Sequence, residues 1–250
     1  MNFQGLNSLN IFMNKFSGNF LPVTNEKKEL TVLLKIYLLI VWLTQLTYLA
    51  TCIFGLFHVP SERVLKDSTI NMIVSVEAII LIIYLSNRKS LLRALIGKLN
   101  YVLLVEDEVL QKAVISTTRP LEKPLRIYTI ASISSVVIWT SLPFFEVFRK
   151  SEFYYTDYRV PAGLFEEPFT VGIFISGVFL QIFGSGYTIT RKVSLDLYTM
   201  HLILLVTAQY KYLRIKFAAI FQQQSSKQQN SNDMIKRKLR LLTYHYGTII

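Results

Sequence analysis

The sequence predicts an all-α polytopic membrane protein with four transmembrane helices, a cytoplasmic N-terminus and a fourth helix that extends into the cytoplasm. The chain of 250 residues is 52% hydrophobic and only 17% charged, whereas an average soluble domain is about 25% charged. Four segments have the length of about 17 to 25 mostly apolar residues that crosses a bilayer. The segments between them differ sharply in Lys and Arg content, which predicts the orientation.

The four apolar segments divide the chain into ten parts. These are a cytoplasmic N-terminal segment (1–31), a first span (32–57), an extracellular loop (58–68), a second span (69–86), a cytoplasmic helical connection (87–126), a third span (127–148), an extracellular loop (149–168), a fourth span (169–190), its cytoplasmic extension (191–222), and a cytoplasmic loop with the start of a possible fifth span (223–250). The first apolar run is too long for a signal-peptide h-region, so we expect it to be retained as the targeting signal.

The positive charge of the chain is a topology signal. Residues 1–57, 87–126 and 191–250 hold 22 of the 27 Lys and Arg, and the two loops on the other side hold the remaining five. Because basic residues collect in cytoplasmic loops, both the N-terminus and the region after the fourth span are predicted to be cytoplasmic. The net charge of +11 is accounted for in this way, and no nucleic-acid partner is expected.

The stretch TRKVSLDLYTMHLILLVTAQYKYL, residues 190–213, begins like a further span but carries Asp196, His201 and Lys211. Only Arg191 and Lys192 could form a turn before it, and two residues cannot connect antiparallel membrane helices. We therefore expect the fourth helix to leave the bilayer near Arg191 and to continue to about Gln222, about 80 Å overall. Its apolar face must then pack against other cytoplasmic helices or another subunit, unless the extension lies flat at the lipid headgroups.

Three features each allow two interpretations. The acidic run Glu106, Asp107 and Glu108 is either a solvated helix end or, less simply, a carboxylate site. The aromatic residues of 144–168 either mark the membrane interface or form a lid over a pocket between the helices. Glu77, in the middle of the second span, is either a functional carboxylate or a protonated group bonded to a neighbouring helix.

No enzyme chemistry is predicted. His58, His201 and His245 are too scattered along the predicted topology to share a metal ion. The sequence contains no glycine-rich phosphate loop, nucleophile elbow or paired histidine motif. We expect no cofactor, no metal site and no catalytic residue, and the single cysteine, Cys52, excludes an intramolecular disulfide.

Several motifs, in this order, resemble the insect odorant receptor family. They are Leu21–Pro22 in FLPVT, Leu142–Pro143 at the end of the third span, YRVP in the aromatic loop, the series Asp196, His201, Gln209 and Leu213 along the fourth-helix extension, and LTYHYGTII with His245. The resemblance covers the whole chain, which corresponds to helices one to four of the seven in that family. Helices five to seven of the family, including the pore helix, have no counterpart in this sequence, so the resemblance implies either a partial gene product or a truncated receptor.

The resemblance implies an olfactory function. Members of that family are odorant-gated cation channels of the plasma membrane, located in sensory-neuron dendrites. A tuning subunit binds small volatile hydrophobic ligands and assembles with a shared co-receptor, expected as a hetero-oligomeric tetramer. An apolar pocket of this kind recognises its ligand by shape and dispersion.

Two groups of residues carry these expectations. The ligand would lie in the outer half of the bundle, and the expected contacts are Met72, Ile73, Val76, Ile138, Trp139, Leu142, Phe174 and Ile175. The fourth-helix extension would form part of a subunit anchor, with Asp196, His201, Leu202, Leu205, Gln209 and Leu213. The alternatives are an insect gustatory receptor, which shares the architecture, and a four-span scaffold or trafficking protein without a ligand.

Overall fold

A computed structural model describes residues 3, 5–26, 30–60, 62, 69–104, 107–160, 165–224 and the single positions 237, 240 and 247. The protein is all-helical, with 82% helix and no strand in the part described. The main helices are α1 (Ser8–Phe16), α2 (Val32–Leu56), α4 (Thr69–Asn87), α5 (Lys89–Leu103), α6 (Glu108–Ser141) and α7 (Val171–Gln224). The predicted start of a fifth span lies almost entirely outside the described residues.

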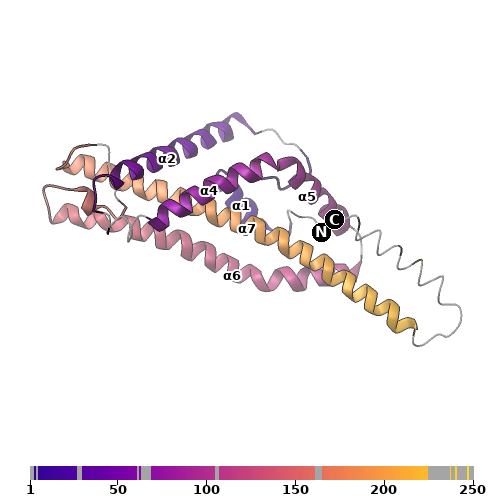
Figure 1. Ribbon diagram of the computed structural model, residues 1–250. Helices are drawn as coiled ribbons and strands as arrows, with labels where there is room; N and C mark the ends of the chain where they lie inside the picture. Colours follow the sequence, from indigo (N-terminus) through magenta and orange to yellow (C-terminus); the bar gives the residue numbers. More distant parts are fainter. Residues whose placement is uncertain are drawn as a thin grey trace.

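The helix α7 is the spine of the molecule (Figure 1). Its 54 residues correspond to about 80 Å, and α1, α2, α4 and α6 all pack along it. The chain has no Pro or Gly between Tyr187 and Tyr246, so nothing in this region interrupts the backbone hydrogen bonds of the helix. The prediction of one continuous helix through residues 190–213 is therefore confirmed.

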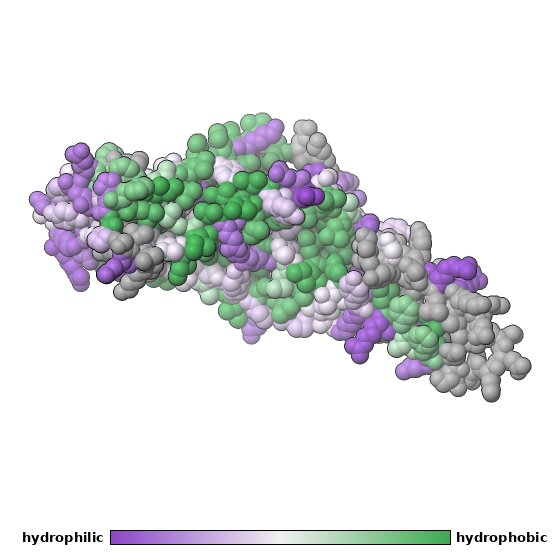
Figure 2. Space-filling model, viewed as in Figure 1, coloured by the Kyte–Doolittle hydropathy of each residue, from purple (hydrophilic) through white to green (hydrophobic). Residues whose placement is uncertain are grey.

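Four helices of the described chain are long and apolar enough to span a membrane: α2, α4, α6 with the turn that follows it, and α7. Their outward faces carry large exposed apolar side chains, among them Leu33 (78% exposed), Ile70 (74%) and Ile138 (62%). Figure 2 shows a broad apolar surface over the middle of the molecule, with polar residues gathered at the end where the residue 149–160 loop lies. An extended apolar surface of this kind is compatible with a membrane protein.

The helix that contains the predicted third span begins well before that span. The helix α6 begins at Glu108, within the predicted helical connection, and it runs through Pro120 and Pro124. Both prolines are exposed, so the carbonyls left without an N–H donor face outward, where water can satisfy them. Near Pro143 the helix changes type, because the α-helix ends at Ser141 and continues as a 3₁₀ helix, η2 (Leu142–Phe148).

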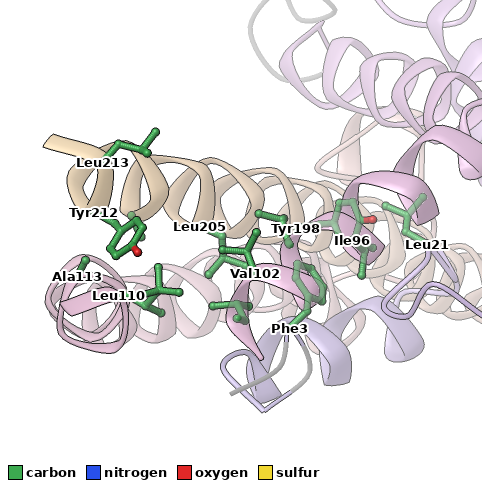
Figure 3. Close-up of a cluster of buried hydrophobic side chains, with 14 of the residues drawn as sticks. Phe3, Leu21, Ile96, Val102, Leu110, Ala113, Tyr198, Leu205, Tyr212 and Leu213 are labelled. Carbon is green, nitrogen blue, oxygen red and sulfur yellow. The ribbon is translucent and has the colours of Figure 1, made fainter. Parts of the chain in front are cut away.

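At the end of the molecule away from the residue 149–160 loop, α5, the first turns of α6 and the extension of α7 form a compact bundle, which we call the inner bundle (Figure 1). Figure 3 shows Leu110 and Ala113 of α6 on the side of α7 that carries Leu205 and Tyr212. All four belong to one buried core that also includes residues of α5 and of the N-terminal segment. The apolar face of the extension is thus covered by helices of the same chain. This agrees with the expectation that the extension packs against other helices.

Two residues of the acidic run, Asp107 and Glu108, lie at the start of α6 in this bundle. Asp107 is the N-cap of α6, where its carboxylate accepts hydrogen bonds from the backbone N–H of Val109 at 2.8 Å and of Leu110 at 3.4 Å. The same side chain bonds the extension of α7, at 2.7 Å from the Lys216 Nζ and 3.1 Å from the Tyr212 hydroxyl. Burial raises the pKa of Asp107, but these hydrogen bonds outweigh burial and lower the pKa below its ordinary value. Asp107 therefore has a structural role, because it caps α6 and joins it to the extension of α7. Glu106 lies outside the described residues.

The two roles of Asp107 can be separated by substitution. Asp107→Ala removes the cap and the ion pair, and we expect it to lower the free energy of unfolding by about 1–2 kcal/mol. Asp107→Asn keeps a capping oxygen and loses only the charge opposite a partly exposed Lys216, so it should cost less than about 1 kcal/mol. Denaturant unfolding of the purified chain in detergent measures both. Equal losses would mean that the charge, not the cap, provides the stabilisation.

Candidate functional site: the outer apolar cavity

The aromatic loop before α7 folds back onto the N-terminal end of that helix, which we call its outer end. Backbone hydrogen bonds join Phe153 and Phe169 in both directions, at 2.7 and 3.3 Å. The Phe153 ring stacks on Phe174 of α7 with a centroid distance of 4.2 Å, and Tyr155 meets Phe169 edge-on at 4.9 Å. Phe153, Phe169 and Phe174 are at most 2% exposed. These buried aromatic residues form a lid, whereas Phe145, Phe148, Tyr154 and Phe165 are exposed, and a place for them at a membrane interface stays a prediction.

Two tyrosine hydroxyls hold the lid in place. Tyr155 donates to the carbonyl of Phe165 at 2.6 Å, and Tyr158 donates to the carbonyl of Phe174 at 3.3 Å. The ring of Tyr158 lies against Gly177, where an added Cβ would be 2.2 Å from the Tyr158 oxygen. Only glycine at this position lets the tyrosine lie flat against α7.

A cavity of about 310 Å³ lies between this lid, α2 and the outer part of α7. Its lining residues are Thr47, Thr51, Tyr158, Phe165, Phe169, Gly172, Ile173, Ser176, Gly177 and Leu180. The lining is mainly apolar, and the polar groups it offers are hydroxyls. The volume is at the lower end of the about 300–1,000 Å³ found for small-molecule sites. Such a cavity suits one small, largely apolar molecule with at most one or two hydrogen-bonding groups.

The eight expected ligand contacts do not line this cavity. Phe174 lies under the lid in the aromatic cluster, and Trp139 packs beside Tyr48 and Cys52. The others lie along the outer ends of α4, α6 and α7: Ile73, Val76 and Ile138 are exposed, and Met72, Leu142 and Ile175 are half-buried. The structure does not bring the eight together, and their role as ligand contacts stays a prediction.

The cavity residues that the sequence reasoning missed come from α2 and from the glycines at the start of α7. The separation of Gly172 and Gly177 by five residues does not fit a Gly-xxx-Gly helix contact. The two glycines have different surroundings. A Cβ on Gly172 would have open space within 4 Å, whereas one on Gly177 would overlap Tyr158. The signal available in the sequence was the aromatic loop itself, because a buried loop needs a small-residue surface to lie on.

The expected anchor residues are mostly buried within the chain. His201, Leu205, Gln209 and Leu213 are at most 5% exposed, and Leu202 packs at the edge of the same core. Asp196 is half-buried and accepts a hydrogen bond from Tyr128 of α6 at 2.8 Å. These side chains therefore contact helices of their own chain. A direct role for them in subunit contact remains untested.

His201 gives the inner bundle a pH dependence. Its ring meets Phe3 edge-on at 5.0 Å, and burial lowers the pKa of the imidazole to about 4. An unfolded histidine titrates near about 6.5, so below that pH the unfolded chain binds a proton that the folded chain does not. The stabilisation is complete above pH 6.5 and is lost as the pH falls toward 4.

We expect the free energy of unfolding to fall by about 2 kcal/mol between pH 7 and pH 5 through His201. His201→Gln keeps a polar group of similar reach but does not titrate, so its stability should vary less over this range. Denaturant unfolding at the two pH values measures the difference. If wild type and His201→Gln change equally, the pH dependence belongs to other groups.

A second polar cluster lies between α2, α4 and α7. Arg191 is fully buried and makes hydrogen bonds to the amide oxygen of Gln45 and to the backbone carbonyl of Ser17, while its guanidinium lies 4.1 Å from the Trp42 ring centroid. The neighbouring Lys192 bridges Glu77 and Asp196, at 2.9 Å from each. Glu77 thus contacts Lys192 of the neighbouring helix α7, and a functional role for this carboxylate stays a prediction.

The surroundings of His201 and the polar cluster around Arg191 do not have the composition of a metal or catalytic centre. No group of three or more His, Cys, Asp or Glu side chains that could hold a metal ion occurs among the described residues. His58 stacks on Tyr155 of the lid, and His245 lies outside the described residues. No protein-family model, no curated protein and no solved structure matches the chain. The cavity under the aromatic lid is therefore the feature from which a function can be argued.

Proposed function

We propose that this chain is a membrane-embedded ligand-binding subunit of the insect odorant receptor type, which binds a small volatile apolar molecule in the cavity under the aromatic lid. The observation that carries the proposal is the cavity itself, about 310 Å³ between α2, the lid and α7. Its mainly apolar lining favours recognition by shape and dispersion. One methylene is worth only about 1–3 kcal/mol in such a site, so related ligands would be distinguished modestly.

Filling the cavity tests this function. Gly172 lines the cavity and has open space around an added Cβ, so Gly172→Leu should occupy the ligand's volume without overlap at the backbone. Gly172→Ala is the matched control, because it makes the same change in helix propensity and leaves most of the cavity free. Small volatile esters, ketones and terpenes should raise the thermal midpoint of wild type and Gly172→Ala in detergent.

The same ligands should leave Gly172→Leu unshifted. If no member of the panel stabilises wild type, or if Gly172→Leu responds like wild type, the cavity is not a ligand site. The scaffold alternative would then be preferred. A binding assay with the chain alone keeps this test independent of the co-receptor and of channel activity.

The proposed topology places the lid outside the cell and the inner bundle in the cytoplasm. The uneven distribution of Lys and Arg supports this orientation. The polar contacts favour one adjustment to the predicted topology. Arg191 and Lys192 bond Gln45 and Glu77, which lie near the middle of α2 and α4. The exit of α7 would thus lie nearer Asp196, which bonds Tyr128 at the predicted inner end of the third span.

Epitope tags test the orientation. A tag before residue 3 and a tag within residues 225–230 should be stained only after permeabilisation of expressing cells. A tag beside the exposed Glu152 should be stained in intact cells. Staining of either of the first two in intact cells would contradict the orientation.

Assembly with a co-receptor, proposed as a tetramer, would use a surface different from the one first expected. Leu205 is completely buried in the chain's own core, so Leu205→Glu would test folding. Met200 (41% exposed) and Ile203 (54%) lie on the outward side of the α7 extension. Ile203→Glu should reduce co-purification with a co-receptor and leave the thermal midpoint of the isolated chain unchanged. Undiminished co-purification would mean that this face is not the interface.

A further inference from the structure

A groove between α1 and α6 changes character along its length. It has a volume of about 580 Å³ and is lined by Ser8, Leu9, Phe12, Met13 and Phe16 of α1 and by Arg126, Thr129, Ile130, Ile133 and Ser134 of α6. Met13, Leu9 and Ile133 form its floor, packed on Val193 and Leu197 of α7. The walls include the stacked rings of Phe12 and Phe16 and the side chain of Ile130, all about half exposed or more.

The inner end of the groove is basic. Arg119, Lys123 and Arg126 recur every three or four residues on α6, so they share one face of the helix, and all three are exposed. None of these three pairs with an acidic side chain within the described residues. The groove itself has no acidic lining residue.

A smaller cavity of about 290 Å³ continues the basic end toward the core. It shares Ser8 and Leu9 with the groove, and its other lining residues include Arg119, Glu122 and His201. The Nε2 atom of His201 is buried and has no hydrogen-bond partner in the described part of the chain. An unpaired polar atom in this position is costly, and a polar group entering the cavity could satisfy it.

We infer that this groove binds an anionic phospholipid of the inner leaflet. The headgroup would lie at Arg119 and Arg126, with the adjoining cavity and His201 beyond it, and an acyl chain would lie along Phe12, Phe16 and Ile130. The change from basic to apolar residues falls between Arg126 and Ile127, where the third span was predicted to begin. The inference rests on the proposed membrane topology, because only a lipid of the inner leaflet would meet both ends of the groove.

Charge and shape both favour a lipid over a free anion. Each Lys or Arg near an anionic lipid surface contributes about a fivefold gain in affinity, and at least two side chains can act here. The apolar half of the groove offers nothing to an inorganic anion. The about 580 Å³ of the groove would be filled by hydrocarbon, which removes exposed phenylalanine and isoleucine surface from contact with water or detergent.

Native mass spectrometry of the full chain in detergent tests the inference without any odorant or co-receptor. Phosphatidylserine should bind more tightly than phosphatidylcholine with the same acyl chains. The variant R119Q/R126Q should weaken phosphatidylserine binding by about thirtyfold and leave phosphatidylcholine binding little changed. The control R88Q/K112Q removes two exposed cytoplasmic-side charges elsewhere and should bind phosphatidylserine like wild type.

The apolar half is tested separately. Phe12 and Phe16 are exposed, so F12A/F16A should fold normally and should bind both lipids more weakly. Glycerophosphoserine, the headgroup without acyl chains, and inorganic phosphate should compete poorly. Equal binding of the two lipids, full retention of phosphatidylserine by R119Q/R126Q, or equal loss in the control would overturn the inference. No odorant is present in these experiments, so their outcomes do not bear on the proposal for the outer cavity. In the same way, a failure of the odorant-binding proposal would not bear on the lipid site.

Discussion

Gln45→Leu is expected to destabilise the protein by about 2–3 kcal/mol, because it removes a hydrogen-bond acceptor from a buried charged group. Arg191 is completely buried, and among the described residues its guanidinium has one side-chain acceptor, the amide oxygen of Gln45, and one backbone acceptor, the carbonyl of Ser17. Leucine has a volume close to that of glutamine, so the loss would come from the missing hydrogen bond to the guanidinium. Denaturant unfolding in detergent, followed by the fluorescence of the adjacent Trp42, measures it.

The double variant Gln45→Leu with Arg191→Met separates this account from a simple packing defect. Removing both the charge and its partner takes away the desolvation cost as well as the hydrogen bond. The double variant should therefore be more stable than Gln45→Leu alone. A double variant that is as unstable as the sum of the two single variants would show that the hydrogen bond between them is not the reason.

Gly184→Ala is expected to cost about 1–3 kcal/mol, the usual range for an overpacked interior. A Cβ at this position would lie 2.2 Å from the Tyr48 Cγ and 2.5 Å from its Cβ. These atoms are at the base of the side chain and cannot move unless α2 moves away from α7. Gly186→Ala is the control, because its added Cβ would come no closer than 4.0 Å to Val137.

A second substitution on the facing helix tests the cause. Tyr48→Gly removes all three atoms that a Cβ at residue 184 would overlap, including the Tyr48 Cβ, so Gly184→Ala should be less harmful in that background than in wild type. Thermal midpoints of the four proteins form the cycle. An unchanged effect of Gly184→Ala in both backgrounds would contradict the close contact between α2 and α7.

The extent of each long helix could be predicted from the sequence. Apolar runs of sufficient length predicted α2 and α4 within one residue at their ends, and the absence of Pro and Gly predicted the continuous α7. The apolar run that predicted the third span did not indicate where its helix begins, because the sequence change at residue 127 is one from polar to apolar residues and not a change of backbone. Asp107 supplies the cap that begins the helix.

The faces of the helices could not be predicted in the same way. A helix that is apolar all round has no amphipathic period, so the sequence indicates depth along α4 and α6 but not rotation about their axes. Ile73 and Ile138 lie in the predicted outer halves of their helices, but their side chains are exposed on the surface of the molecule. In the α7 extension the amphipathic pattern was informative, yet it could not distinguish packing on another subunit from packing on α5 and α6.

The central claim is that a small apolar molecule binds under the aromatic lid, and photo-crosslinking tests it most directly. An alkyl diazirine ligand would be activated on the full chain in lipid nanodiscs, and labelled peptides would be identified by mass spectrometry. Saturable labelling should fall on residues 169–180 of α7 or on the lid around Tyr158, and should disappear in Gly172→Leu but not in Gly172→Ala. Labelling that is not saturable, or that is confined to the lipid-facing sides of α4 and α6, would contradict the account.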